Sequence, residues 1–212
     1  MSNLKEITNV VNLCGEICSE LEMSHEIFGE KFYNTAIRVK RLSDLDDVLP
    51  ITISERLITD MELTLGKQVS ITGQIRSYNK FLEGKNRLVV TVFVKEISED
   101  FEDTKDPNTI FLDGYVCKHP IYRNTPLGRE ITDLLIAVNR SYNKSDYIPS
   151  IAWGRNAKFS KNLQVGDRVQ IWGRMQSREY EKKTENGEVE SKVAYEISIS
   201  KMKKMPENNA KE

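Results

Sequence analysis

The feature that most constrains this chain is an internal repeat, because a duplicated sequence folds into two similar units. At an offset of 99, the matched pairs include Asn9 and Asn108, Leu13 and Leu112, Gly15 and Gly114, Cys18 and Cys117, Arg41 and Arg140, Asp47 and Asp146, and Pro50 and Pro149. One inserted residue moves the offset to 100 and adds Leu63 and Leu163, Gly66 and Gly166, Val69 and Val169, Ile71 and Ile171, Gly73 and Gly173, and Ser77 and Ser177. One offset held over about 45 residues predicts two copies, 9–98 and 108–203.

The stretch between the copies, residues 99–107, is acidic and ends at Pro107, which predicts a linker. The 212 residues are enough for two small domains. We therefore predict domains over 1–98 and 108–205, joined by that acidic linker. The polar end, residues 206–212, predicts a disordered tail.

The formal net charge of −1 conceals a marked asymmetry between the two copies. Residues 1–99 carry 12 Lys and Arg against 15 Asp and Glu, whereas residues 108–205 carry 17 against 11. The second copy is therefore a basic domain, and such an asymmetry favours polyanion binding by that half.

Several classes of protein are excluded by what the sequence lacks. No apolar run approaches the roughly 20 residues of a membrane span, and the N-terminus lacks the pattern of a secretion signal. Three cysteines cannot build a disulfide framework and indicate a reducing compartment. We therefore expect a cytoplasmic protein that has no membrane partner.

The second copy alternates apolar and polar residues in a way that is typical of strands. Strands are predicted over 110–117, 130–140, 147–153, 168–175 and 193–199, with a short helical stretch over 156–163. Gly114 and Gly173 lie inside strands, where they suit the bulges or sharp coiling of a small closed barrel. The first copy repeats this order. We predict an all-β chain of two tandem five-stranded OB-fold barrels, each with a short helix after strand three.

Enzyme chemistry finds little support in the sequence. The two histidines, His25 and His119, do not occupy matching positions in the two copies. The string Cys14, Cys18, His25 has no fourth soft ligand nearby, and no phosphate or dinucleotide fingerprint occurs. We expect a protein that is not an enzyme and that uses no cofactor, metal or small-molecule substrate.

Four segments of the second copy resemble bacterial single-stranded DNA-binding proteins (SSB). The stretches 135–142, 151–155, 165–180 and 196–200 are similar to the second, third, fourth and last strands of that family. The resemblance implies an OB-fold that wraps single-stranded DNA, with four OB domains acting together. Relatives with two such domains per chain form dimers, so we expect a homodimer.

One departure from the family lies at the end of the chain. Typical members finish in a flexible tail with an acidic tip and a terminal Phe, whereas this sequence ends in Asn-Asn-Ala-Lys-Glu212. The difference implies a specialised or accessory member.

Binding of single strands requires flat rings for the bases and cations along the phosphates. The resemblance implies base stacking at Tyr142, Tyr147, Trp153 and Tyr180. Trp172, opposite the predicted core face, is a further candidate ring. The candidate phosphate contacts are Arg140, Arg155, Lys158, Arg174, Arg178, Lys182 and Lys183. The competing interpretation is that these rings are core residues, since strands favour aromatic side chains.

The first copy lacks the rings, because Ser43, Val48, Ser54 and Lys80 stand at the matching positions. We expect it to be a structural, dimer-forming barrel. Weak DNA contacts are expected through Arg76, Lys80, Lys85 and Arg87, with Tyr78 as a partial substitute for Tyr180.

The leading hypothesis is a non-catalytic, largely sequence-independent binder that protects single-stranded DNA in replication, repair or recombination, associated with the nucleoid. Two alternatives remain open. One is an RNA-binding or replication-restart module, because stacking and phosphate contacts discriminate weakly between sugars. The other is an OB-fold scaffold that binds protein through its acidic half.

Overall fold

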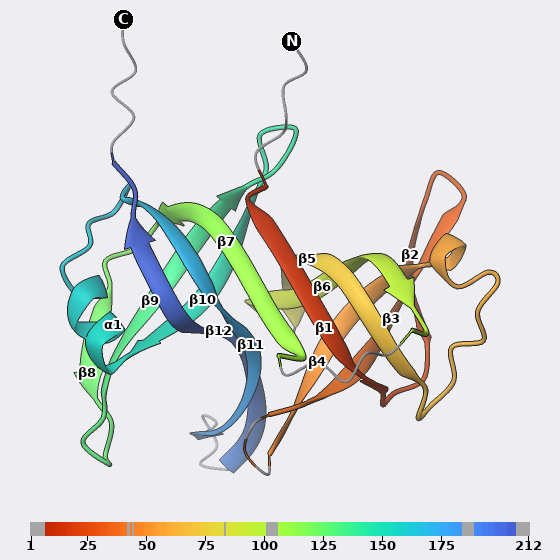
Figure 1. The fold of residues 1–212 in the computed structure, drawn as a ribbon, viewed down its shortest axis with the longest axis horizontal. Helices are drawn as coiled ribbons and strands as arrows, with labels where there is room; N and C mark the ends of the chain where they lie inside the picture. Colours follow the sequence, from red (N-terminus) through yellow and green to blue (C-terminus); the bar gives the residue numbers. More distant parts are fainter. Residues whose placement is uncertain are drawn as a thin grey trace, which may run out of the picture.

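The computed structural model describes residues 7–41, 43, 45–82, 84–100, 106–183 and 189–206, and over these it is almost entirely β-structure. The first repeat contains β1 (Asn9–Ile17), β2 (Glu22–Ile27), β3 (Glu30–Lys40), β4 (Asp46–Ser54), the 3₁₀ turn η1 (Glu55–Leu57), β5 (Gln68–Leu82) and β6 (Lys85–Ser98). The second contains β7 (Asn108–Val116), β8 (Ile121–Asn124), β9 (Glu130–Asn139), β10 (Ser145–Trp153), the helix α1 (Gly154–Ser160), β11 (Arg168–Lys183) and β12 (Val189–Lys204). The all-β prediction is confirmed (Figure 1).

In each repeat the strand pairings form a ring. β1 pairs with β3 and β5, β3 pairs with β4, β5 pairs with β6, and β4 and β6 close the ring in parallel. The second repeat pairs β7, β9, β10, β12 and β11 in the same way. Burial of alternate residues drives closure, since Val11, Leu13 and Ile17 of β1 all lie inside.

Glycine permits the tight curvature of β5 and β11, two long strands that occupy matching places in the repeats. The register of β5 shifts at Gly73 and that of β11 shifts at Gly173, as in a β-bulge. A Cβ at Gly173 would lie 2.2 Å from the carbonyl oxygen of Ser198, so no larger residue fits. The predicted role of Gly173 in coiling its strand is confirmed.

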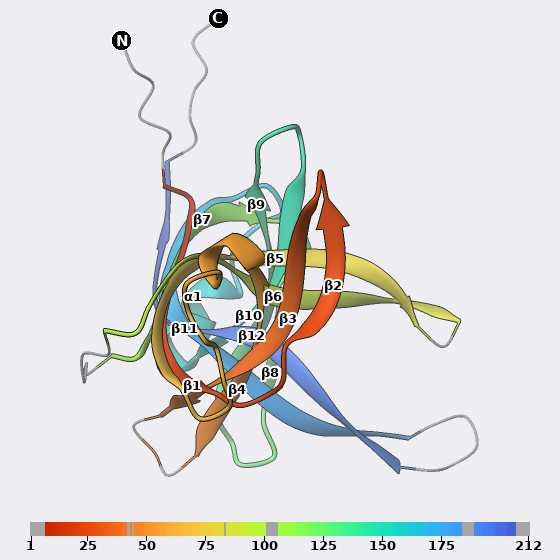
Figure 2. The same ribbon diagram turned by 90° about the vertical axis from the view of Figure 1, so that its right-hand side faces the viewer.

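The two repeats join edge to edge through their first strands. β1 and β7 pair antiparallel, from Asn9 opposite Leu112 to Leu13 opposite Asn108, which makes one continuous 12-stranded sheet. Figure 1 shows these two strands side by side between the repeats, and Figure 2 shows β5–β6 and β11–β12 extending beyond the barrels as long arms.

A second set of contacts, which we call the seam, binds each repeat to the other through a buried carboxylate. Asp47 accepts hydrogen bonds from Ser177 N at 2.7 Å and Arg174 Nη1 at 2.9 Å, both of the second repeat. Arg41 of its own repeat donates a further hydrogen bond to the same carboxylate. Asp146 accepts from Ser77 N at 2.7 Å and Arg76 Nη1 at 3.1 Å. The side chains of Asp47 and Asp146 are 1% and 0% exposed.

The reciprocity of the seam holds the two barrels in one arrangement. The hydroxyl of Ser77 also accepts from Tyr147 N at 2.7 Å, and that of Ser177 accepts from Val48 N at 3.3 Å. A buried carboxylate needs its partners, because an unpaired buried charge is strongly destabilising. The chain therefore behaves as one body whose two repeats face each other about an approximate two-fold relation.

Candidate nucleic-acid interface

The turn between β9 and β10 holds Tyr142 outside the barrel. Arg140 N donates to Lys144 O at 2.7 Å and closes the turn, and Tyr142 and Asn143 adopt left-handed φ values of 62° and 54°. Such values are unusual for residues other than glycine and concentrate at functional sites. The Tyr142 side chain is 94% exposed. The turn thus presents a bare aromatic ring to solvent.

β10 carries two more of the predicted rings on one face. Tyr147 near its start is 46% exposed, and Trp153 at its end is half-buried where α1 begins. Their even spacing places both side chains on the same side of the strand. Ile151 lies between them and is buried. The strand therefore offers two separated rings rather than a continuous aromatic stripe.

Tyr180 lies on the arm formed by β11 and β12 and is 39% exposed. The Arg178 guanidinium is 5.7 Å from its ring centroid and also pairs with Glu196 at 3.2 Å. A cation near the ring face is attracted by the negative face of the π-system. None of Tyr142, Tyr147, Trp153 and Tyr180 belongs to the buried core.

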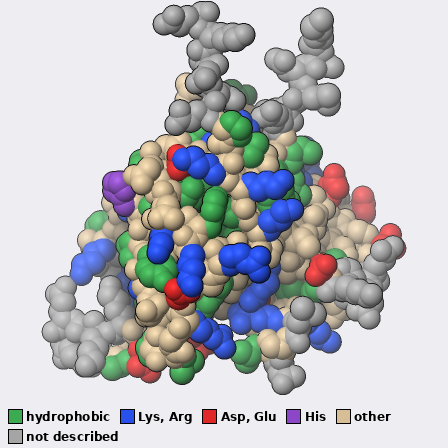
Figure 3. Space-filling view, turned by 60° about the vertical axis from the view of Figure 1, so that its left-hand side comes forward, with side chains coloured by type: hydrophobic (Ala, Val, Ile, Leu, Met, Phe, Trp, Pro, Cys, Tyr) green, Lys and Arg blue, Asp and Glu red, His purple; other side chains and the backbone are tan. Residues whose placement is uncertain are grey.

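Trp172 lies apart from the other rings, on the outer surface of β11. Its ring is tilted against Phe111 at a centroid distance of 5.3 Å, and the ammonium groups of Lys201 and Lys203 lie 5.1 and 5.8 Å from its centroid. Figure 3 shows a face of the molecule on which Lys and Arg side chains gather among hydrophobic ones. Phe111, Lys201 and Lys203 were not predicted, because two other strands, β7 and β12, bring them to Trp172.

The predicted phosphate contacts fall into different environments. Arg140 and Arg174 belong to the seam, where they pair with Asp146 at 3.2 Å and Asp47 at 2.9 Å. Lys158 forms a surface pair with Glu130 at 3.0 Å, and Arg155 is exposed near the start of α1. The side chains of Lys182 and Lys183 lie outside the described residues, as do most of the predicted linker and the end of the tail.

The weakness of an exposed ion pair matters for these cations. Surface pairs are worth about 0–1 kcal/mol, so Lys158 can exchange its carboxylate for a phosphate at little cost. Arg174 is tied to a buried carboxylate, which makes such an exchange costly. A phosphate contact by Arg174 would therefore add to its ion pair with Asp47 and not replace that pair, a restriction that the sequence did not reveal.

The histidines and cysteines show no arrangement suited to catalysis. The His25 ring stacks on Phe32 at 4.9 Å, and Cys14 lies in β1 with its thiol 3.4 Å from Ser70 Oγ. Burial raises the pKa of the thiols of Cys18 and Cys117, which disfavours thiolate formation. In the part of the chain that the structure describes, no three His, Cys, Asp or Glu residues form a group that could hold a metal ion.

The described residues contain no helix with the length and apolar character needed to cross a bilayer.

The fold and the exposed rings together define a tandem barrel protein whose second repeat carries an aromatic and basic surface. Residues 107–205 match the profile described as "Single-strand binding protein family". Through this second repeat the chain is similar to the single-strand binding protein family.

Individual proteins are similar to this chain over part of their length. Single-stranded DNA-binding protein 1 of Staphylococcus aureus (strain COL) is 35% identical over 81 residues, covering 35% of this chain and 48% of that protein. Single-stranded DNA-binding protein 2 of Listeria innocua is 32% identical over 81 residues, covering 35% of this chain and 51% of that protein. The chain spans about half the length of the curated relatives that it matches.

A solved structure extends the similarity in fold to both repeats. The wild-type single-stranded DNA binding protein from Thermus aquaticus has a TM-score of 0.76 with this chain, covering 96% of each at 17% sequence identity. This likeness concerns the fold, and it includes the tandem arrangement of the two repeats.

Proposed function

We propose that this protein binds and protects single-stranded DNA without catalysis and largely without sequence preference, in replication, repair or recombination. The observation that carries the proposal is the set of unburied rings on the second repeat, Tyr142, Tyr147, Trp153 and Tyr180. Unpaired bases expose π-faces that stack on such rings, whatever the base. Trp172 with its two lysines is proposed as a further stacking surface.

Phosphate contacts are assigned to the cations around these rings. We propose Arg155, Lys158 and Arg178 as direct contacts, with Lys182 and Lys183 on the arm, and Arg140 and Arg174 as contacts made from the seam. Counterion release by these groups gives binding a steep salt dependence. The first repeat, an OB-fold barrel of the same design, serves mainly as a structural partner.

We further propose that two chains associate, so that four OB domains act together. Each domain would be a five-stranded barrel, within boundaries of 1–98 and 108–205. A mass measurement in solution tests the assembly, with twice the 24.4 kDa of one chain as the expected result. A monomeric mass at the working concentration would contradict it.

Tryptophan fluorescence tests the proposed function directly, because Trp153 and Trp172 are the two tryptophans and both belong to the second repeat. Adding oligo-dT to the full chain should quench their emission, and salt should weaken the quench. No quench at low salt would favour a protein-binding scaffold instead. Equal competition by poly-U would indicate that the protein does not distinguish RNA from DNA.

A further inference from the structure

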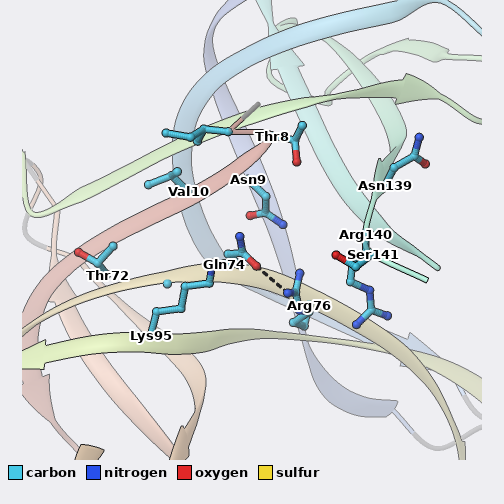
Figure 4. A pocket seen from close by; sticks show the side chains of 12 residues that line it. Thr8, Asn9, Val10, Thr72, Gln74, Arg76, Lys95, Asn139, Arg140 and Ser141 are labelled. Atoms are coloured by element: carbon cyan, nitrogen blue, oxygen red, sulfur yellow. Dashed lines mark hydrogen bonds between the residues drawn. The ribbon is translucent and has the colours of Figure 1, made fainter. Parts of the chain in front are cut away.

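A cavity at the seam is lined by residues of both repeats, and its wall carries more positive than negative charge. It measures about 480 Å³ and lies where the start of β1 and the strands β5 and β6 of the first repeat meet the end of β9. Its lining includes Arg76, Lys95 and Arg140, and the described residues that form its wall include no Asp or Glu. Figure 4 shows the side chains of Arg76 and Lys95 on the first-repeat side and Arg140 on the other.

The two arginines of this cavity, which we call the seam pocket, share a single carboxylate. Arg76 Nη1 and Arg140 Nε lie 3.1 and 3.2 Å from the same oxygen of Asp146. Two guanidinium charges against one carboxylate leave an excess of positive charge. Gln74 Oε1 accepts from Arg76 Nη2 at 2.6 Å and fixes that side chain toward the cavity.

The positive charge of Arg76 and the Nε donor of Arg140 are both incompletely compensated by their surroundings. Burial, the larger cause, and the nearby Arg140 charge lower the pKa of Arg76 despite its pair with Asp146. The Nε of Arg140 is buried and makes no hydrogen bond to the described residues. An anion in the cavity would relieve the repulsion between the two guanidiniums and accept the unused donor.

The corresponding cavity on the Asp47 side of the seam has a different balance of positive and negative charge. It measures about 340 Å³ and is lined by Lys40, Arg41 and Arg174 together with two carboxylates, Asp47 and Asp106. The approximate two-fold relation therefore produces one cavity with carboxylates on its wall and one without. The seam pocket is the one better suited to an anion.

The position of the seam pocket connects it with the proposed stacking rings. Ser141 lines the pocket, and the next residue is the fully projecting Tyr142. We expect a base stacked on Tyr142 to bring its own phosphate, or that of a neighbouring nucleotide, near the pocket entrance. Tyr147 approaches the same seam through the hydrogen bond of its backbone to Ser77.

We propose that the seam pocket is a phosphate site built jointly by the two repeats, which takes a phosphate group of the bound strand. The proposal rests on the proposed binding of single-stranded DNA for the origin of that phosphate. It assigns the first repeat a specific part in binding: it supplies cations to a shared pocket rather than rings. A small phosphorylated molecule offers the same chemistry and is distinguished by the test.

The test introduces a carboxylate into the pocket of the full-length protein. Gln74→Glu keeps the side-chain size and the acceptor for Arg76 while opposing the positive charge. Gln68→Glu is the matched control, because it adds the same charge to an exposed position of the same strand, outside the pocket. Lys95→Gln is a second pocket variant, and thermal unfolding of all three checks that they fold.

Two measurements separate the possible results. In the first, inorganic phosphate is titrated into labelled protein while the arginine Nε–H resonances are followed by NMR. We expect shifts at Arg76 and Arg140 in the wild type and in Gln68→Glu, and much weaker shifts in Gln74→Glu. In the second, oligo-dT affinity is measured against salt. We expect Gln74→Glu and Lys95→Gln to weaken binding severalfold and to reduce the slope of log K against log salt by about 0.7.

The outcomes distinguish this proposal from the proposed function. Phosphate shifts without any binding of oligo-dT would support the pocket, with a small phosphorylated ligand as its source, and overturn DNA binding. Normal oligo-dT binding in all variants together with phosphate shifts would also assign the pocket to a small ligand. If oligo-dT binds, no phosphate shift occurs and Gln74→Glu behaves like Gln68→Glu, the phosphate site is wrong while DNA binding stands.

Discussion

The two repeats share one architecture but use matching positions for different purposes. Trp153 precedes α1 and makes no side-chain capping bond, whereas Ser54 at the matching position caps η1 by accepting from Arg56 N at 3.2 Å. Tyr147 and Val48 both bond through their backbone to a serine of the other repeat, yet only Tyr147 offers a ring. The two repeats thus share one scaffold, and only the second presents aromatic rings at these positions.

The largest effect should come from removing the four rings of the second repeat together. Replacing Tyr142, Tyr147, Trp153 and Tyr180 with Ala should lower oligo-dT affinity by roughly a thousandfold or more, since each stacked base contributes at least about 1 kcal/mol. Fluorescence anisotropy of a labelled oligomer measures the loss. The matched control replaces Ser43, Val48, Ser54 and Lys80 with Ala. Equal losses in both variants would show that the repeats do not differ in binding.

The seam, in contrast, should be equally important from both sides. Asp146→Ala and Asp47→Ala should each reduce the free energy of unfolding by about 3–5 kcal/mol, because each removes a buried carboxylate that pairs with two partly buried arginines. Urea denaturation of the full chain provides the measurement. Asp133→Ala, which removes an exposed pair with Arg123, is the control and should cost about 0–1 kcal/mol. A small loss of stability at either seam aspartate would contradict the conclusion that both carboxylates hold the two repeats together.

Exchanging one matched pair tests the specialisation at a single position. Tyr147→Val gives the second repeat the residue of the first and should cost about 1–3 kcal/mol of oligo-dT binding. Val48→Tyr makes the reverse change and should increase affinity if the first repeat lies along the path of the DNA. Both side chains are exposed, so stability should change little in either variant. Unchanged affinity of Tyr147→Val would remove this ring from the site.

The smallest effect concerns an individual surface cation. Lys158→Ala should reduce the salt dependence of oligo-dT binding by about 0.7 in the slope of log K against log salt. The corresponding position of the first repeat is Thr59, and Thr59→Lys is not expected to steepen the slope. Oligo-dT affinities of the wild type and both variants, measured over a series of salt concentrations, give the slopes to be compared. A slope that Lys158→Ala leaves unchanged would place this lysine outside the phosphate path.

Much of the barrel was predictable because buried strands carry a visible alternation. The predicted strand 130–140 corresponds to β9, and the predicted helix 156–163 begins two residues earlier and ends three residues earlier in the structure. β2 and β8 were not predicted, since every residue of β2 is exposed and neither strand shows an apolar alternation. The arms were underestimated for a related reason: beyond the barrel, β11 and β12 have no core face to set a pattern.

The seam could not be predicted, although its residues were visible as repeat matches. Arg41 and Arg140, Asp47 and Asp146, and Ser77 and Ser177 all align between the copies, yet the bonds of Ser77 and Ser177 to the aspartates span 69 and 130 residues. A repeat match shows that two positions are alike and does not show that they meet across an interface. For the same reason Arg140 and Arg174 were interpreted simply as phosphate contacts, and the cavity beside Arg76 was not anticipated.

The antiparallel pairing of β1 with β7 has a consequence for the peptide that connects the repeats. Backbone hydrogen bonds and the buried aspartates already hold the two repeats together. The peptide that connects the repeats therefore contributes little to keeping them associated. A protein nicked by a protease between Asp100 and Asp106 should therefore keep migrating as a single species under native conditions, and its fragments should part only in denaturant.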